Sequence, residues 1–371
     1  MKVVGFLFCI FMHMEKRTPT GRIQELDVLR TVAMLFVITY HFGCEYSAQG
    51  IPFFNILYHT ANSDFGNIAV TIFIALSGGL LYKKYKDVSH GDLKAFYTKR
   101  IKAIYPPFWI LSLYIPLTML RHLLTDGNVF FMGNPAKLLL TVIGFDGYVK
   151  MYGIETYAFC GDWFVGAIVL LYLLYPLLAA AYRRHPAILL LAATAAYALQ
   201  FLIPESYGLV LSVLPFTLVL KFCLGFAIVE NLERFRDKRV ILVAAVVFAL
   251  LSLVDIPGPL NTDFFGTAAA FALFIALFGI APQLLRSPKV STAVNKVAVL
   301  SYCVFLVQHV GIIWTQAAFV KVFEKMQWDF SAWMVAALLA LTLAIIFVAA
   351  WILKQVSDQV VKVLSPKHPA N

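Results

Sequence analysis

The chain has 371 residues, of which 61% are hydrophobic and 13% are charged, whereas soluble domains are about half apolar and a quarter charged. Its formal net charge is +10 at neutral pH. This composition excludes disordered, collagen-like and disulfide-scaffold proteins, and it predicts an all-α polytopic membrane protein. The five cysteines stand singly, without the spacing of a metal-binding module, so no metal site is predicted.

Apolar segments bounded by polar residues predict a bundle of about ten transmembrane helices. We place them at residues 26–43, 67–82, 104–120, 161–181, 186–203, 210–229, 240–254, 264–283, 297–320 and 332–353. The segment 240–254 is short, and 104–120 contains Pro106, Pro107 and Pro116. These two segments are therefore expected to be tilted, kinked or partly re-entrant.

Lysine and arginine are distributed unequally between the two sides of the predicted bundle. With the N-terminus in the cytoplasm, the inside segments hold 23 of the 30 Lys and Arg residues. Because cytoplasmic loops collect basic residues, both termini are predicted to be cytoplasmic. Topology thus explains the positive charge, and no nucleic-acid partner is predicted.

The predicted domains follow from these spans. We expect a membrane domain over 26–353, between a cytoplasmic N-terminal stub, 1–25, and a cytoplasmic basic tail, 354–371. The first fourteen residues are apolar but too short to span a bilayer. They form an interfacial segment, or translation starts at Met14.

An arginine and a histidine share one face of the first predicted span. Arg30 and His41 are eleven positions apart, about 20° past three full helical turns and about 16 Å along the axis. Ionisable groups inside a span are costly, so they need a partner or a function. One interpretation pairs Arg30 with Asp27 at the headgroups and leaves His41 at the interface. The other is a polar seam that faces the interior of the bundle.

Two later spans also carry polar side chains. Lys221 lies in the middle of 210–229, where its amine either reaches the interface or contacts a buried anion or carboxylate. Gln308 and His309 lie inside 297–320. A helix-packing hydrogen bond and a role in a site are both open for this pair.

The predicted inside segment 83–103 contains seven basic residues, among them Lys99, Arg100 and Lys102. Such a cluster anchors a protein to anionic lipid or binds the phosphates of a nucleotide cofactor. The residues alone leave both interpretations open.

Polar and aromatic residues also gather at the outer side. Asp64 lies in a polar loop, and Asp162 and Trp163 begin the fourth span. A carboxylate beside an aromatic ring suits sugar binding, although an interfacial tryptophan is often only a membrane anchor. Cys44 and Cys160 fall at outer helix ends, where a disulfide is conceivable and packing as free thiols is the commoner alternative.

These elements resemble, in order and spacing, the integral membrane acyltransferase family 3, bacterial enzymes that O-acylate cell-surface glycans and related acceptors. The most specific match is ELDVLRTVAMLFVITYH, with ten residues between Arg30 and His41. Further matches are IFIALSG with Ser77, KRIKAIYPPFW in the basic segment, and LSYCVFLVQH in the late span. The similarity covers nearly the whole chain.

The resemblance implies an O-acyltransferase of the inner (cytoplasmic) membrane. Its donor would be acyl-CoA, with acetyl-CoA the first expectation, and its acceptor would be a glycan or lipid-linked saccharide. His41 would act as a general base or a transient acyl carrier, and Arg30 would assist it. Glu45, one turn on, either orients the histidine ring or is simply solvated.

The remaining roles that we assign follow the same resemblance, together with the positions described above. The expected donor-binding residues are Arg30, Lys99, Arg100, Lys102 and Ser77. The expected acceptor-binding residues are Asp64, Asp162, Trp163, Gln308 and His309. No oligomeric state is predicted.

The chain also departs from the family pattern. Ala103 stands where a second arginine usually follows three residues after Arg100, and His309 follows Gln308 where many members have a histidine. The common glutamate downstream of Trp163 is missing. A transporter or flippase is the main alternative, because Arg30, His41 and Lys221 would also line a solute path, although no inverted repeat is found. Nothing positive supports a non-catalytic assembly partner.

Overall fold

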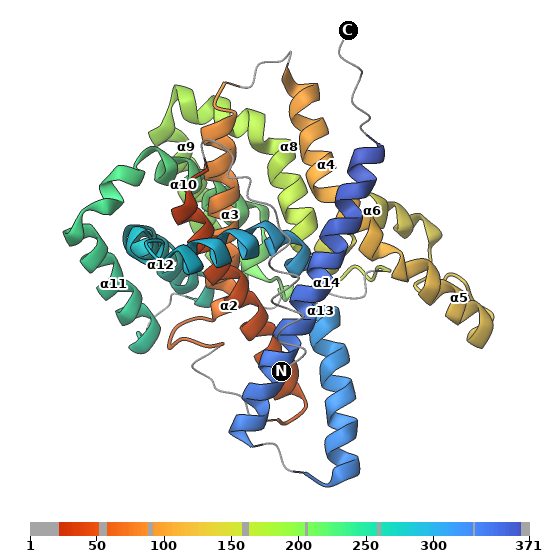
Figure 1. The fold of residues 1–371 in the computed structure, drawn as a ribbon. Coiled ribbons are helices and arrows are strands. Elements are labelled where there is room, and N and C mark those ends of the chain that lie inside the picture. The colour runs from red at the N-terminus through yellow and green to blue at the C-terminus, as the bar shows by residue number, and fades with distance from the viewer. Residues whose placement is uncertain are drawn as a thin grey trace.

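The computed structural model describes residues 22–51, 58–87, 92–157, 163–204, 207–257, 261–328 and 331–364. Over these residues the regular secondary structure is helical and no strand is formed, which confirms the all-α prediction (Figure 1). The α-helices are α2 (Gln24–Ala48), α3 (Phe65–Lys84), α4 (Leu93–Ser112), α5 (Tyr114–Asp126), α6 (Leu138–Ile143), α7 (Asp146–Lys150), α8 (Trp163–Arg184), α9 (Pro186–Leu199), α10 (Pro215–Glu230), α11 (Lys238–Leu253), α12 (Thr262–Leu284), α13 (Pro288–Met326) and α14 (Ala332–Val363).

Every predicted span coincides with helical structure, but the helices differ in length. In the described part of the chain, seven are long and apolar enough to cross a membrane: α2, α3, α4 together with α5, α8, α12, α13 and α14. The protein is therefore a multi-pass membrane protein. The helices α9, α10 and α11 have 14, 16 and 16 residues, fewer than the about 20 that a perpendicular crossing needs. A count of ten crossings and the cytoplasmic termini stay predictions.

Proline divides the predicted span 104–120. Helix α4 ends at Ser112 and α5 starts at Tyr114, and Figure 1 shows α5 leaving the direction of α4. Pro116 has no N–H to donate to the carbonyl of Ser112, and its ring crowds that carbonyl. The break falls one turn before Pro116, whereas Pro106 and Pro107 lie inside α4 without ending it.

The last two helices are longer than their apolar segments. Helix α13 begins at Pro288 and ends at Met326, and α14 continues to Val363, whereas the predictions were 297–320 and 332–353. The first residues of the predicted tail therefore continue a helix, in which Lys354 and Asp358 form an ion pair. The stub at 1–21 and the end of the tail at 365–371 lie outside the described residues.

Small residues let α3 and α10 approach until their backbones touch. A Cβ atom added to Gly78 would clash with the carbonyl oxygen of Phe222, and one added to Gly225 would clash with that of Ala75. Small residues at helix contacts are typical of membrane bundles. This close packing brings Lys221 of α10 toward the polar start of α3. Around it, α2 packs against α3, α12 and α13.

Candidate functional site

A cavity of about 560 Å³ lies among the ends of several helices. It is lined by His41 of α2, His309 of α13, Trp163 of α8 and Asp64 at the start of α3. Four residues that the sequence nominated separately thus line one space, which we call the outer cavity, following the predicted topology. Asp162, also nominated, lies outside the described residues.

The two histidines of the outer cavity contact each other directly. Nδ1 of His41 lies 3.1 Å from Nε2 of His309, and their ring centroids are 4.0 Å apart. One of these nitrogens carries the shared proton and donates it, because neutral imidazole has one donor and one acceptor nitrogen. The pair leaves Nε2 of His41 as the nitrogen not used in this contact.

The other two residues nominated beside these histidines have different surroundings. The backbone carbonyl oxygen of Glu45 accepts a hydrogen bond of 2.6 Å from the side-chain amide of Gln316. The Gln308 side chain is fully buried, and neither its amide nitrogen nor its oxygen has a hydrogen-bond partner in the described structure. Successive helical residues project about 100° apart, so Gln308 and His309 face different directions. The roles proposed for Glu45 and Gln308 stay predictions.

A second cavity, of about 230 Å³, surrounds Arg30 and is called the inner cavity below. Nη1 of Arg30 donates to Asp27 at 3.0 Å, so the ion pair of the first interpretation forms while Arg30 also faces a cavity. Ser77 and Tyr172 line the same space, with their hydroxyl oxygens 3.0 Å apart. The nominated Arg30 and Ser77 are thus brought together.

Among the described residues, Phe305 lines both cavities. The ring centroids of Phe305 and Phe164 are 4.6 Å apart, and those of Phe164 and Phe73 are 6.2 Å apart. The same four helices, α2, α3, α8 and α13, contribute to both linings. Phe305 therefore forms part of the wall of each cavity. No signal in the sequence indicated this role for Phe305.

Of the three nominated basic residues of α4, only Arg100 lines a described cavity, a separate one of about 500 Å³ that shares Ile104 and Tyr172 with the inner cavity. Its guanidinium lies 5.8 Å from the ring centroid of Tyr172, and its buried Nε has no hydrogen-bond partner in the described structure. Ala103, one turn on, lines the inner cavity. Lys99 and Lys102 are exposed, as residues that meet anionic lipid or a soluble anion need to be.

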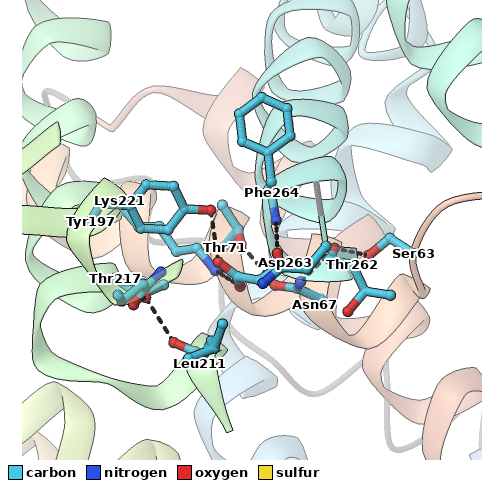
Figure 2. Close-up of polar contacts among 12 residues, drawn as sticks. Ser63, Asn67, Thr71, Tyr197, Leu211, Thr217, Lys221, Thr262, Asp263 and Phe264 are labelled. Atoms are coloured by element: carbon cyan, nitrogen blue, oxygen red, sulfur yellow. Dashed lines mark hydrogen bonds and ion pairs between the residues drawn. The ribbon is translucent and has the colours of Figure 1, made fainter. Parts of the chain in front are cut away.

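Lys221 is buried in the protein and forms an ion pair with Asp263 of α12. Its Nζ lies 2.8 Å from Oδ1 of Asp263 and 3.2 Å from Oδ1 of Asn67 (Figure 2). The hydroxyl of Tyr197 donates to the other Asp263 oxygen at 2.9 Å. The predicted contact of Lys221 with a buried carboxylate is confirmed. Sequence reasoning missed Asp263, which fell in a predicted outer loop.

Asp64 extends this polar group at the start of α3. Its carboxylate caps the helix by accepting the backbone N–H of Asn67 at 2.7 Å. Burial raises the pKa of this carboxyl group, and the hydrogen bond from the Asn67 N–H opposes that shift. The same cap orients Asn67, whose side-chain oxygen contacts Lys221. The polar starts of α3 and α12 therefore meet at one side of the outer cavity.

The described residues include no group of three or more His, Cys, Asp and Glu side chains placed to hold a metal ion. Cys44 is a free thiol in the structure. Its proposed partner, Cys160, lies outside the described residues, so their pairing stays a prediction.

Comparison with known proteins gives one match. A family model described as an acyltransferase domain matches residues 23–353, which is most of the chain. No curated protein and no solved structure matches the sequence. The matched region contains both cavities and all the helices that line them.

Proposed function

Because the chain belongs to acyltransferase family 3, we propose that it moves an acyl group, first of all acetyl, from cytoplasmic acyl-CoA to a hydroxyl of a cell-surface glycan or lipid-linked saccharide. The observation that supports this proposal is that Arg30 lines one cavity and the His41 and His309 pair lines another, with Phe305 and parts of α2, α3, α8 and α13 in both linings. We infer that the two cavities are halves of one path, with Phe305 between them. Such a path allows a donor and an acceptor to approach the same histidines from opposite sides.

The inner end of the path suits a phosphate-bearing donor. Arg30 faces the inner cavity, and Arg100, whose buried Nε lacks a hydrogen-bond partner in the described structure, lines a separate cavity that shares Tyr172 with it. Guanidinium groups bind phosphate through paired N–H donors. Arg30 lies about 16 Å from His41 along α2, a distance similar to the reach of a pantetheine arm.

Acyl-CoA would supply a thioester carbonyl, and the protein would supply the base. Nε2 of His41 takes the proton from the acceptor hydroxyl, whose oxygen then bonds to the acyl carbon. The carbon–sulfur bond breaks, and the proton passes from His41 to the departing sulfur. In a two-step variant, Nε2 itself carries the acyl group before the hydroxyl attacks. His309 holds Nδ1 of His41 in either case.

The test is acyl transfer by the purified protein in lipid nanodiscs. Acetyl-CoA labelled in its acetyl group is supplied with saccharides from bacterial envelopes, and mass spectrometry follows the addition of acetyl to the acceptor. We expect transfer by the wild type and none by His41→Ala. Thermal stabilisation by acetyl-CoA checks donor binding separately. A protein that is not stabilised and transfers nothing would instead fit the transporter alternative.

A further inference from the structure

The outer cavity has a polar side formed by the starts of two helices, in addition to its histidines. Asp64 and Asn67 come from the start of α3, and Asn261, Thr262 and Asp263 come from the start of α12. Carboxylates accept hydrogen bonds, amides both accept and donate, and sugar hydroxyls do both. This side of the cavity therefore matches a polyhydroxylated ligand.

The charges of this lining are acidic. None of the described residues that line the outer cavity is Lys or Arg. The nearby amine of Lys221 is fully buried and bonded to Asp263 and Asn67. Lys221 offsets the charge of Asp263 but not that of Asp64, so a ligand carboxylate or phosphate would meet the Asp64 carboxylate without a free cation from the described lining.

The N-termini of α3 and α12 do not supply the missing positive charge, because protein side chains already cap them. The Asp64 carboxylate accepts the Asn67 N–H at 2.7 Å, and the Asn261 side chain accepts the Phe264 N–H at 3.1 Å. Protein oxygens thus already use the groups that otherwise attract anions at a helix start.

The buried pair also fixes the Asp263 carboxylate. Lys221 bonds one of its oxygens and Tyr197 bonds the other (Figure 2). Each carboxylate oxygen has a further lone pair for a second donor. Trp163 lines the same cavity and offers an aromatic face to the carbon–hydrogen side of a sugar ring.

We propose that this polar side binds the acceptor, and that the acylated sugar is neutral, without a carboxylate or phosphate. The chemistry rests on the proposed function, whereas the binding preference does not need acyl transfer to occur. Lys221 and Tyr197 act as positioning residues for Asp263.

The test measures binding without any acyl donor. Ser212 lines the outer cavity. The reporter is Ser212→Cys in a protein whose Cys44 and Cys160 are replaced by Ser. A ligand in the cavity slows the reaction of the new thiol with an impermeant maleimide. The probes are methyl gluco-, galacto- and mannopyranosides, each compared with its C6-carboxylate. We expect at least one neutral glycoside to protect the thiol at about tenfold lower concentration than its carboxylate.

Two variants separate charge from hydrogen bonding. Asp64→Asn keeps a good helix cap and should reduce the preference for the neutral glycoside. Lys221→Met with Asp263→Asn removes the pair together and should weaken protection by the neutral glycoside about tenfold. The exposed Asp87→Asn is the charge control and should change neither value.

Equal or better protection by the carboxylates would overturn the proposal, as would the absence of protection by every glycoside. A protein that binds neutral glycosides but transfers no acyl group would contradict the proposed function alone.

Discussion

Nδ1 of His41 and Nε2 of His309 lie 3.1 Å apart, although 268 positions separate the two residues in the sequence. When Nδ1 of His41 carries the proton, His309 accepts it, and Nε2 of His41 has a free lone pair. His309 would then hold the tautomer, the task that a carboxylate performs in Ser-His-Asp triads.

Replacing His309 should slow acyl transfer without abolishing donor binding. We expect His41→Ala to lower the single-turnover rate below detection, by about 10²-fold or more, and His309→Ala to lower it less. His309→Gln, which retains an acceptor oxygen, should recover part of the loss and keep the acetyl-CoA stabilisation. A wild-type rate of acyl transfer in His309→Ala would show that His309 does not position His41.

Arg30 should contribute chiefly to donor binding. Arg30→Ala should raise the KM for acetyl-CoA more than Arg30→Lys, because an ammonium replaces only part of a planar guanidinium. Steady-state kinetics at saturating acceptor give both constants. Equal, full activity of both variants would reduce Arg30 to a partner of Asp27.

Phe305 should control passage between the two cavities. Ser301 lines the inner cavity, so Ser301→Cys should react slowly with an impermeant maleimide from the outer side. Adding Phe305→Ala should speed that reaction, while Phe305→Leu should change it less because the leucine fills more of the space. Equal rates in all three proteins would show that Phe305 is not the partition.

Replacing Lys221 alone should destabilise the protein more than replacing Lys221 and Asp263 together. Lys221→Met leaves a buried carboxylate uncompensated and should cost about 3–5 kcal/mol, whereas adding Asp263→Asn should restore much of the loss. Thermal unfolding in nanodiscs measures both. Similar melting temperatures for the single and double variants would contradict this coupling.

Hydropathy located the helices but not their ends. The prediction 67–82 lies within α3, Phe65–Lys84, because nearly all of that helix is apolar and it ends in Lys83 and Lys84. In α13 the polar ends continue the helix, since Lys, Glu and Val do not stop one and no proline interrupts it after Pro288. A run of apolar residues therefore indicates the part of a helix that can lie in the membrane. It does not indicate where the helix begins and ends.

Helical periodicity predicted that Arg30 and His41 face one direction, because both lie on α2. It could not predict that His309 meets His41, since periodicity within one helix says nothing about which helices pack together. Asp263 illustrates a usable signal that was missed: a buried Lys221 requires an opposite charge nearby. Phe305 offered no signal, because an apolar residue in an apolar span is ordinary.

The most direct measurement is acyl transfer across a bilayer by protein oriented in sealed proteoliposomes. Labelled acetyl-CoA is enclosed on the side of Lys99 and Lys102, and the saccharide acceptor is supplied only on the side of the outer cavity. We expect labelled acceptor with the wild type and none with His41→Ala. Labelling that requires donor and acceptor on the same side, or that persists in His41→Ala, would contradict it.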